Sequence, residues 1–163
     1  MTKATEFAPE EAGFLYDLPF IVAGTSLAVI HVSAFKAIKT AVSFYSIVRD
    51  TSKQFPDNEC IQTIFAHKDV QQGHNELIEK HQANGKDAAV SIRNGMCEQA
   101  LGILNGKCSE QETEEYKHWL LSIASEVMHK AQSHGFLGLG KERAEAEIAQ
   151  ALQDFSLVLQ LPQ

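Results

Sequence analysis

The sequence predicts an all-α protein, a single-domain bundle of five to seven helices around a buried hydrophobic N-terminal helix at about residues 18–32. The stretch from Leu18 to Ile30 is apolar on nearly every face, and a helix of that kind must be enclosed by other helices. The segments that follow place apolar residues three and four positions apart, which is the spacing of one-sided helices. No segment alternates polar and apolar residues and no hairpin signal occurs, so we expect no strands.

The composition fits one soluble domain with its own core. The chain has 163 residues, of which 44% are hydrophobic and 21% charged, and this size supports a core without disulfides or structural metals. Its 14 Lys and Arg against 21 Asp and Glu give a net charge of −7, which disfavours nucleic acid as a partner because phosphate binding needs a basic surface. The three cysteines form no CxxC pair, so we expect reduced thiols in the cytoplasm and no cofactor. Residues 1–8 are predicted to be a polar tail and residues 9–163 one helical domain.

The first helix is predicted from its starting residues and from the apolar run. Pro9 is followed by two acids, and proline suits the first helical turn while acids favour the positive end of the helix dipole. Pro19 is expected either to begin a second helix or to kink the first. Asp17 and Pro19 close one end of the apolar run and His31 the other. The run is then too short to cross a bilayer, and we expect no membrane association.

Two helices are predicted in the next part of the chain. Ser33 is expected to cap a helix that runs to about Gln54, and Asp57 or Asn58 can cap a shorter one. Residues 68–85 are strongly polar and are interpreted as an exposed helix or a crossover. The predicted buried stripe of the first of these helices consists of Phe35, Ile38, Val42, Tyr45 and Val48.

The second half of the chain predicts three helices. The first starts at Asp87 and stops at residues 105–106, which read Asn-Gly. Ser109 and Glu112 form a capping box that begins the second helix, and the third runs over about residues 142–159. The capping-box helix is predicted to bury Tyr116, Trp119, Leu120, Ile123, Val127 and Ala131.

Two ExxH pairs on the capping-box helix are candidate metal ligands. They are Glu115 with His118 and Glu126 with His129, a spacing that puts both ligands of a pair on one helix face, as in carboxylate-bridged di-iron bundles. Those bundles take their pairs from different helices, whereas these two pairs share one helix and lie about 16 Å apart. We therefore interpret the pairs as a solvated face. They stay metal candidates together with His74, the middle one of three histidines spaced by seven residues.

The loop from Gly135 to Glu142 is one residue short of the phosphate-binding pattern GxxxxGK[ST]. An acid stands where that pattern needs a hydroxyl, and the preceding segment is helical rather than a strand. We therefore interpret the loop as a turn between two helices. Its apolar side chains either tuck inward or contact a protein partner, and these candidate interaction residues are Phe136, Leu137 and Leu139.

Two stretches carry a resemblance to a known family. The opening FAPEEAGFLYDLPFIVAG and the segment from Glu114, EEYKHWLLSIASEVMHKAQSHGFLGLGKERAEAEIAQALQ, resemble small bacterial all-helical proteins of unassigned function. That family is distantly similar to the tellurite-resistance TerB-like helical fold, which implies a helical bundle here. TerB-type proteins carry an acidic metal motif in the first helical hairpin. The corresponding stretch, GTSLAVIHVSAFKAI, has no acid, so the resemblance implies no metal ligands.

Together these features predict a cytoplasmic, non-catalytic binding or interaction module. Its partner is expected to be another protein or a second copy of the chain, as in a homodimer. No serine or cysteine lies in the context of a catalytic motif. The alternative is a metal- or small-ligand-binding helical protein that uses the His/Glu face, and a third hypothesis is an apolar-ligand pocket beside residues 24–26.

Overall fold

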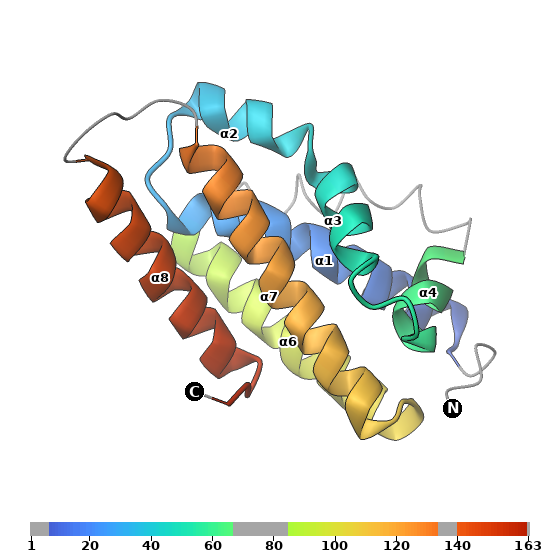
Figure 1. Ribbon diagram of the computed structural model, residues 1–163. Helices are drawn as coiled ribbons and strands as arrows, with labels where there is room; N and C mark the ends of the chain where they lie inside the picture. Colours follow the sequence, from blue (N-terminus) through green and yellow to red (C-terminus); the bar gives the residue numbers. More distant parts are fainter. Residues whose placement is uncertain (1–6, 67–84, 134–139, 163) are drawn as a thin grey trace.

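A computed structural model describes residues 7–66, 85–133 and 140–162. Within these ranges the chain forms seven helices and no strand, which confirms the all-α prediction. Figure 1 shows α7 crossing the middle of the molecule, with α8 on one side and α3 and α4 on the other. The helices are α1 (Pro9–Val29), α2 (Ala34–Ala41), α3 (Phe44–Ser52), α4 (Glu59–Ala66), α6 (Lys86–Lys107), α7 (Glu110–Gln132) and α8 (Gly140–Val158).

The buried N-terminal helix is present, but its ends differ from the prediction. α1 begins at Pro9 and continues through Pro19 to Val29, so neither a second helix nor a break occurs at Pro19. It is 21 residues long and apolar enough to cross a membrane, and 67% of its most apolar window is buried inside the protein. The length argument against a spanning helix is therefore wrong, and burial against α6 and α7 is what favours a core helix. Phe7, which falls in the predicted polar tail, is also buried.

A hydrogen bond from α7 explains how Pro19 fits inside α1. Proline has no N–H, so Pro19 cannot donate to the carbonyl of Leu15 one turn earlier. The hydroxyl of Tyr116 on α7 donates to that carbonyl at 2.9 Å instead. Burial raises the pKa of Tyr116 well above its usual range, which keeps this donor protonated. Because an unpaired buried carbonyl is costly, the Tyr116 hydroxyl stabilises the helix at its proline.

Removal of the Tyr116 hydroxyl tests this arrangement. We expect Tyr116→Phe to lower the free energy of unfolding by about 1–3 kcal/mol, the cost of leaving a buried acceptor unpaired. The loss should be smaller in a Pro19→Ala background, because the new backbone N–H can donate to the Leu15 carbonyl. Urea unfolding of the four proteins, followed by circular dichroism, measures this coupling as a double-mutant cycle. Tyr45→Phe, at an exposed hydroxyl, is the control, and equal losses in both backgrounds would contradict the assignment.

The single helix predicted from Ser33 to Gln54 is wrong, because the structure has two helices there. Ser33 caps α2 as expected, and its Oγ accepts from the backbone N–H of Lys36 at 3.4 Å. The helix ends at residues 42–43, where the N–H of Ser43 donates to the carbonyl of Thr40 at 2.9 Å. This tighter turn separates α2 from α3, and α3 packs against α7 with Phe44, Ile47 and Val48 buried.

The other described helices begin close to the predicted positions. Asn58, one of the two predicted caps of α4, accepts from the N–H of Ile61 at 2.9 Å. The predicted capping box of α7 is present: the Glu112 N–H donates to Ser109 Oγ at 3.2 Å, and the Ser109 N–H donates to the Glu112 carboxylate at 2.9 Å. All six residues of the predicted α7 stripe are buried. Side chains from all the described helices except α2 form one buried cluster, and part of α2 packs against it.

Candidate functional site

The exposed face of α2 is the most apolar part of the described surface. Phe35 is 76% exposed, Ile38 68% and Val42 80%. Tyr45, in the first turn of α3, is 49% exposed. These four residues, here called the α2 stripe, were predicted to be buried, and that prediction is wrong. Only Val48, the fifth member of the predicted set, is buried.

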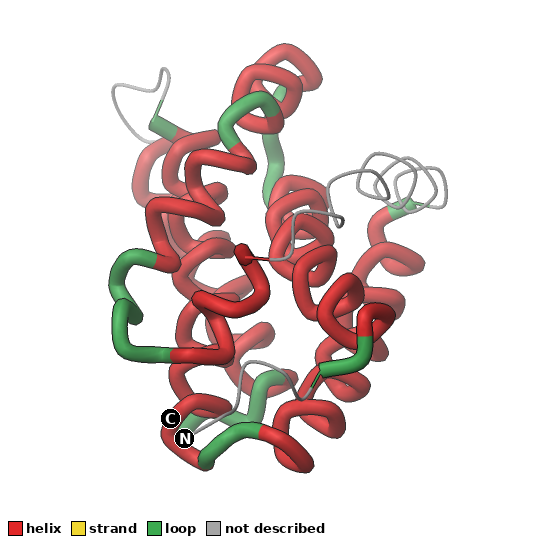
Figure 2. Tube along the Cα trace, turned by 90° about the vertical axis from the view of Figure 1, so that its right-hand side faces the viewer, coloured by secondary structure: helices red, strands yellow, loops and turns green. Residues whose placement is uncertain are grey.

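The side chains on the inner side of α2 explain why its apolar face points outward. α2 packs on α7 through its small side chains: Thr40 is buried, and Ala37 and Ala41 are half-buried. Small residues allow two helices to approach closely, so the larger residues of α2 are left on the opposite face. α2 lies at one end of the bundle in both views of the molecule, which keeps that face away from the other helices (Figures 1 and 2).

Positive charge flanks the α2 stripe. Lys36 and Lys39 lie on α2, and the guanidinium of Arg49 lies 5.8 Å from the centre of the Tyr45 ring. No Asp or Glu occurs between residues 18 and 49, although the whole chain carries a net charge of −7. The stripe therefore combines exposed apolar side chains with a local excess of cations, in contrast to the rest of the chain.

The predicted metal candidates are dispersed along α7. Glu115 is half-buried and accepts hydrogen bonds from Asn58 Nδ2 at 2.8 Å and from Gln111 Nε2 at 3.0 Å. His118, Glu126 and His129 are exposed, as the solvated-face interpretation expects. Among the described residues no three His, Cys, Asp or Glu side chains are grouped so that they could hold a metal ion. The candidate His74, like His67 and His81, lies outside the described residues, so a metal site that includes it stays a prediction.

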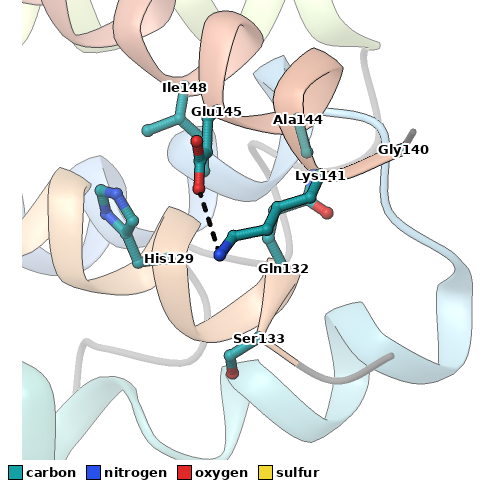
Figure 3. Close-up of a pocket in the computed structure, with 8 residues that line it drawn as sticks. All are labelled: His129, Gln132, Ser133, Gly140, Lys141, Ala144, Glu145 and Ile148. Atoms are coloured by element: carbon teal, nitrogen blue, oxygen red, sulfur yellow. Dashed lines mark ion pairs between the residues drawn. The ribbon is translucent and has the colours of Figure 1, made fainter. Parts of the chain in front are cut away.

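A small cavity lies where the end of α7 meets the start of α8 (Figure 3). Its volume is about 270 Å³, and its walls combine apolar atoms with a few polar side chains. Figure 3 shows His129 on α7 beside the ion pair between Lys141 Nζ and Glu145 Oε1, which are 3.8 Å apart. The predicted interaction residues Phe136, Leu137 and Leu139 belong to the connection between these two helices and lie outside the described residues. The lining residues are His129, Gln132, Ser133, Gly140, Lys141, Ala144, Glu145 and Ile148.

His31, which follows α1, is joined to α8 on the far side of this junction. Its backbone N–H donates to Glu147 Oε2 at 3.2 Å, and its ring pairs with the same carboxylate. Burial would raise the pKa of Glu147, but the hydrogen bonds from His31 outweigh it and the pKa is lowered. The pair ties the connection between α1 and α2 to α8, and so helps to position α2 at the end of the bundle.

The cysteines do not form a reactive centre in the part of the chain that the structure describes. Cys60 and Cys97 are buried and Cys108 is half-buried, and all three are free thiols. Burial raises the pKa of Cys97 to about 12. A hydrogen bond with Cys108, together with burial, raises the pKa of Cys60 above its usual range. Thiols with raised pKa values are poor nucleophiles at neutral pH, so these side chains are suited to packing.

The α2 stripe is thus the candidate site that the structure adds to those found in the sequence. The periodicity of residues 35–48 marked its members but not the direction in which they point. The TerB-like resemblance rests on the sequence stretches alone. In comparisons with known proteins, the chain matches no family model, no curated protein and no solved structure.

Proposed function

We propose that the protein is a non-catalytic, cytoplasmic interaction module that binds a protein partner or a second copy of itself through the α2 stripe. The observation that supports this proposal is the exposure of Phe35, Ile38 and Val42, between 68% and 80%. Apolar patches on the surface of a soluble protein mark interaction sites, whereas single exposed apolar residues do not. A distant TerB-like relationship is part of this proposal, and the all-helical bundle is compatible with it.

The energetics of the stripe favour binding. Full burial of a Val, Ile or Phe side chain contributes about 1.5–3 kcal/mol relative to full exposure. The three most exposed residues of the stripe retain most of that free energy for an interface, because the bundle covers only a small part of each. A partner that covers them would gain it without any change in the core.

A charge placed in the stripe tests the proposal. We expect Ile38→Glu to abolish binding of the partner, or self-association, because the carboxylate would be desolvated in the interface. The free energy of unfolding should change by less than about 0.5 kcal/mol, as for other exposed positions. Light scattering after gel filtration measures self-association, and affinity capture with immobilised protein measures partner binding.

The matched control is Leu157→Glu on α8, where the leucine is 58% exposed but lies outside the stripe. This variant should bind like the original protein. A monomeric protein that captures no partner, or binding that Ile38→Glu and Leu157→Glu reduce equally, would contradict the proposed function.

A second candidate function is binding of a metal ion or a small ligand at the cavity between α7 and α8. The observation in its favour is that His129, one of the predicted metal candidates, lines this cavity together with Glu145. Native mass spectrometry of untagged protein should then show a stoichiometric mass above that of the apo chain. The extra mass should disappear in His129→Ala and persist in His118→Ala, where an exposed histidine lies outside the lining. A mass equal to that of the apo chain would contradict this second function.

A further inference from the structure

We propose that α2 is the inserted helix of a helix-in-groove complex, and that its partner is a protein with an apolar groove rimmed by Asp and Glu. The inference rests on the proposed function and specifies the chemistry of the partner. It follows from the spacing of the stripe, from the shape of the surface and from the charges beside it.

The spacing of the stripe is that of a helix that inserts into a groove. Helices of this kind present apolar anchors at positions i, i+3 or i+4, and i+7. Phe35, Ile38 and Val42 occupy i, i+3 and i+7, and each is more than two thirds exposed. Tyr45 extends the same line into the first turn of α3 and adds an aromatic ring with a polar edge.

α2 is already folded, so its insertion needs no coupled folding. Ser33 caps its start, and α7 supports its inner side. Its eight residues make a rod about 12 Å long, a surface too small for a standard protein–protein interface on its own. A concave partner that wraps around the rod uses its sides as well as its outer face. A groove therefore gains more contact from α2 than a flat surface does.

The charges beside the stripe indicate the rim of the groove. Lys36 and Lys39 are placed so that they can reach past the apolar anchors, and Arg49 lies beside Tyr45 at the other end. The absence of acidic residues from 18 to 49 leaves this end of the molecule positive, while the chain as a whole is negative. Asp and Glu on the rim complement this local charge, and they also steer the partner to the stripe rather than to the acidic remainder.

Two other occupants fit these observations less well. In a symmetric dimer the same patch meets itself, which would bring the lysines of the two copies together. An anionic lipid surface would attract Lys36 and Lys39 but would repel a chain with a net charge of −7. A protein groove with an acidic rim avoids both penalties.

A photo-crosslinking experiment tests the inference on the full chain. The photoreactive amino acid p-benzoylphenylalanine is placed at position 35, or at position 157 as the control, and the proteins are irradiated in cells. Crosslinked peptides are identified by mass spectrometry, and the captured protein is purified. Its affinity for the original chain, Ile38→Glu, Lys36→Glu/Lys39→Glu and Leu157→Glu is then measured by calorimetry at low and high salt.

The inference expects crosslinks from position 35 to an apolar groove that contains Asp or Glu on its rim. Lys36→Glu/Lys39→Glu should weaken binding by about 2- to 30-fold at low salt, as expected for the loss of two exposed ion pairs, and by less at high salt. Leu157→Glu should bind unchanged. Crosslinks between two copies of the chain would overturn the inference and leave the proposed function standing. Crosslinks to lipid, crosslinks only within the chain, or none that depend on position 35 would overturn both. A captured partner whose affinity is insensitive to the lysine substitutions would overturn the acidic rim.

Discussion

Trp119→Ala is expected to lower the free energy of unfolding by about 3–5 kcal/mol, a large fraction of the 5–15 kcal/mol that stabilises a typical domain. Trp119 is fully buried on α7, and its ring centre lies 5.5 Å from that of Tyr116 and 5.7 Å from that of Phe65. Its indole N–H donates to Thr51 Oγ1 on α3 at 3.0 Å. The substitution therefore opens a cavity among three helices and removes a buried donor. For a chain of this length the melting temperature should fall by about 6–20 °C, which circular dichroism measures.

Trp119→Phe separates the two contributions. The ring of phenylalanine keeps part of the packing but has no N–H, so we expect a loss between that of Trp119→Ala and zero. A further comparison in a Thr51→Val background shows how much of the loss belongs to the hydrogen bond, since Thr51 Oγ1 then no longer accepts it. A change in melting temperature below about 2 °C for Trp119→Ala would contradict the central position of this side chain in the core.

The α2 stripe shows what helical periodicity can predict and what it cannot. The spacing of Phe35, Ile38 and Val42 correctly indicated a one-sided helix, because the period of the pattern depends only on local geometry. The direction of that side depends on what the helix packs against. α2 contacts α7 through Thr40 and through small alanines, and no local signal announces that a helix uses its small residues inward. The same property that made the stripe look like core makes it a candidate interaction site.

Pro19 illustrates a second limit of the sequence. The position of a proline in an apolar run favours a break, because the lost hydrogen bond is a local cost. The compensating donor, Tyr116, is 101 residues away in the sequence. The fold class and the buried stripe of α7 could be predicted, since both follow from patterns within single helices. The path of α1 through Pro19 could not be predicted, because it depends on a contact between distant segments.

Glu115 gives the corresponding lesson for the candidate site. Its spacing from His118 indicated a ligand pair, a pattern that lies within one helix. In the structure its carboxylate instead accepts from Asn58, at the start of α4. The short-range pattern was real, but the function of the side chain is determined by a neighbour from another helix.

Asn58→Ala is expected to lower the free energy of unfolding by about 2–3 kcal/mol, more than a cap alone contributes. Asn58 is 1% exposed, and it joins two helices. Its Oδ1 accepts from the Ile61 N–H at 2.9 Å, and its Nδ2 donates to the Glu112 carbonyl at 3.0 Å and to Glu115 Oε2 at 2.8 Å. The substitution therefore weakens the start of α4 and leaves the Glu115 carboxylate with fewer donors. Urea unfolding measures the loss, and Asp57→Ala, at the exposed neighbouring position, should change the free energy by less than about 0.5 kcal/mol.

Asn58→Asp distinguishes the cap from the link to α7. The new carboxylate can still accept from the Ile61 N–H, but it cannot donate to the Glu112 carbonyl or to Glu115. Two carboxylates would then face each other, and like charges disfavour the ionised forms in the folded state. The folded protein therefore binds protons more readily than the unfolded chain, so the penalty of Asn58→Asp should shrink as the pH falls and the pair takes up a proton. A penalty that is independent of pH would mean that Asn58 acts only as the cap of α4 and that its amide does not hold Glu115.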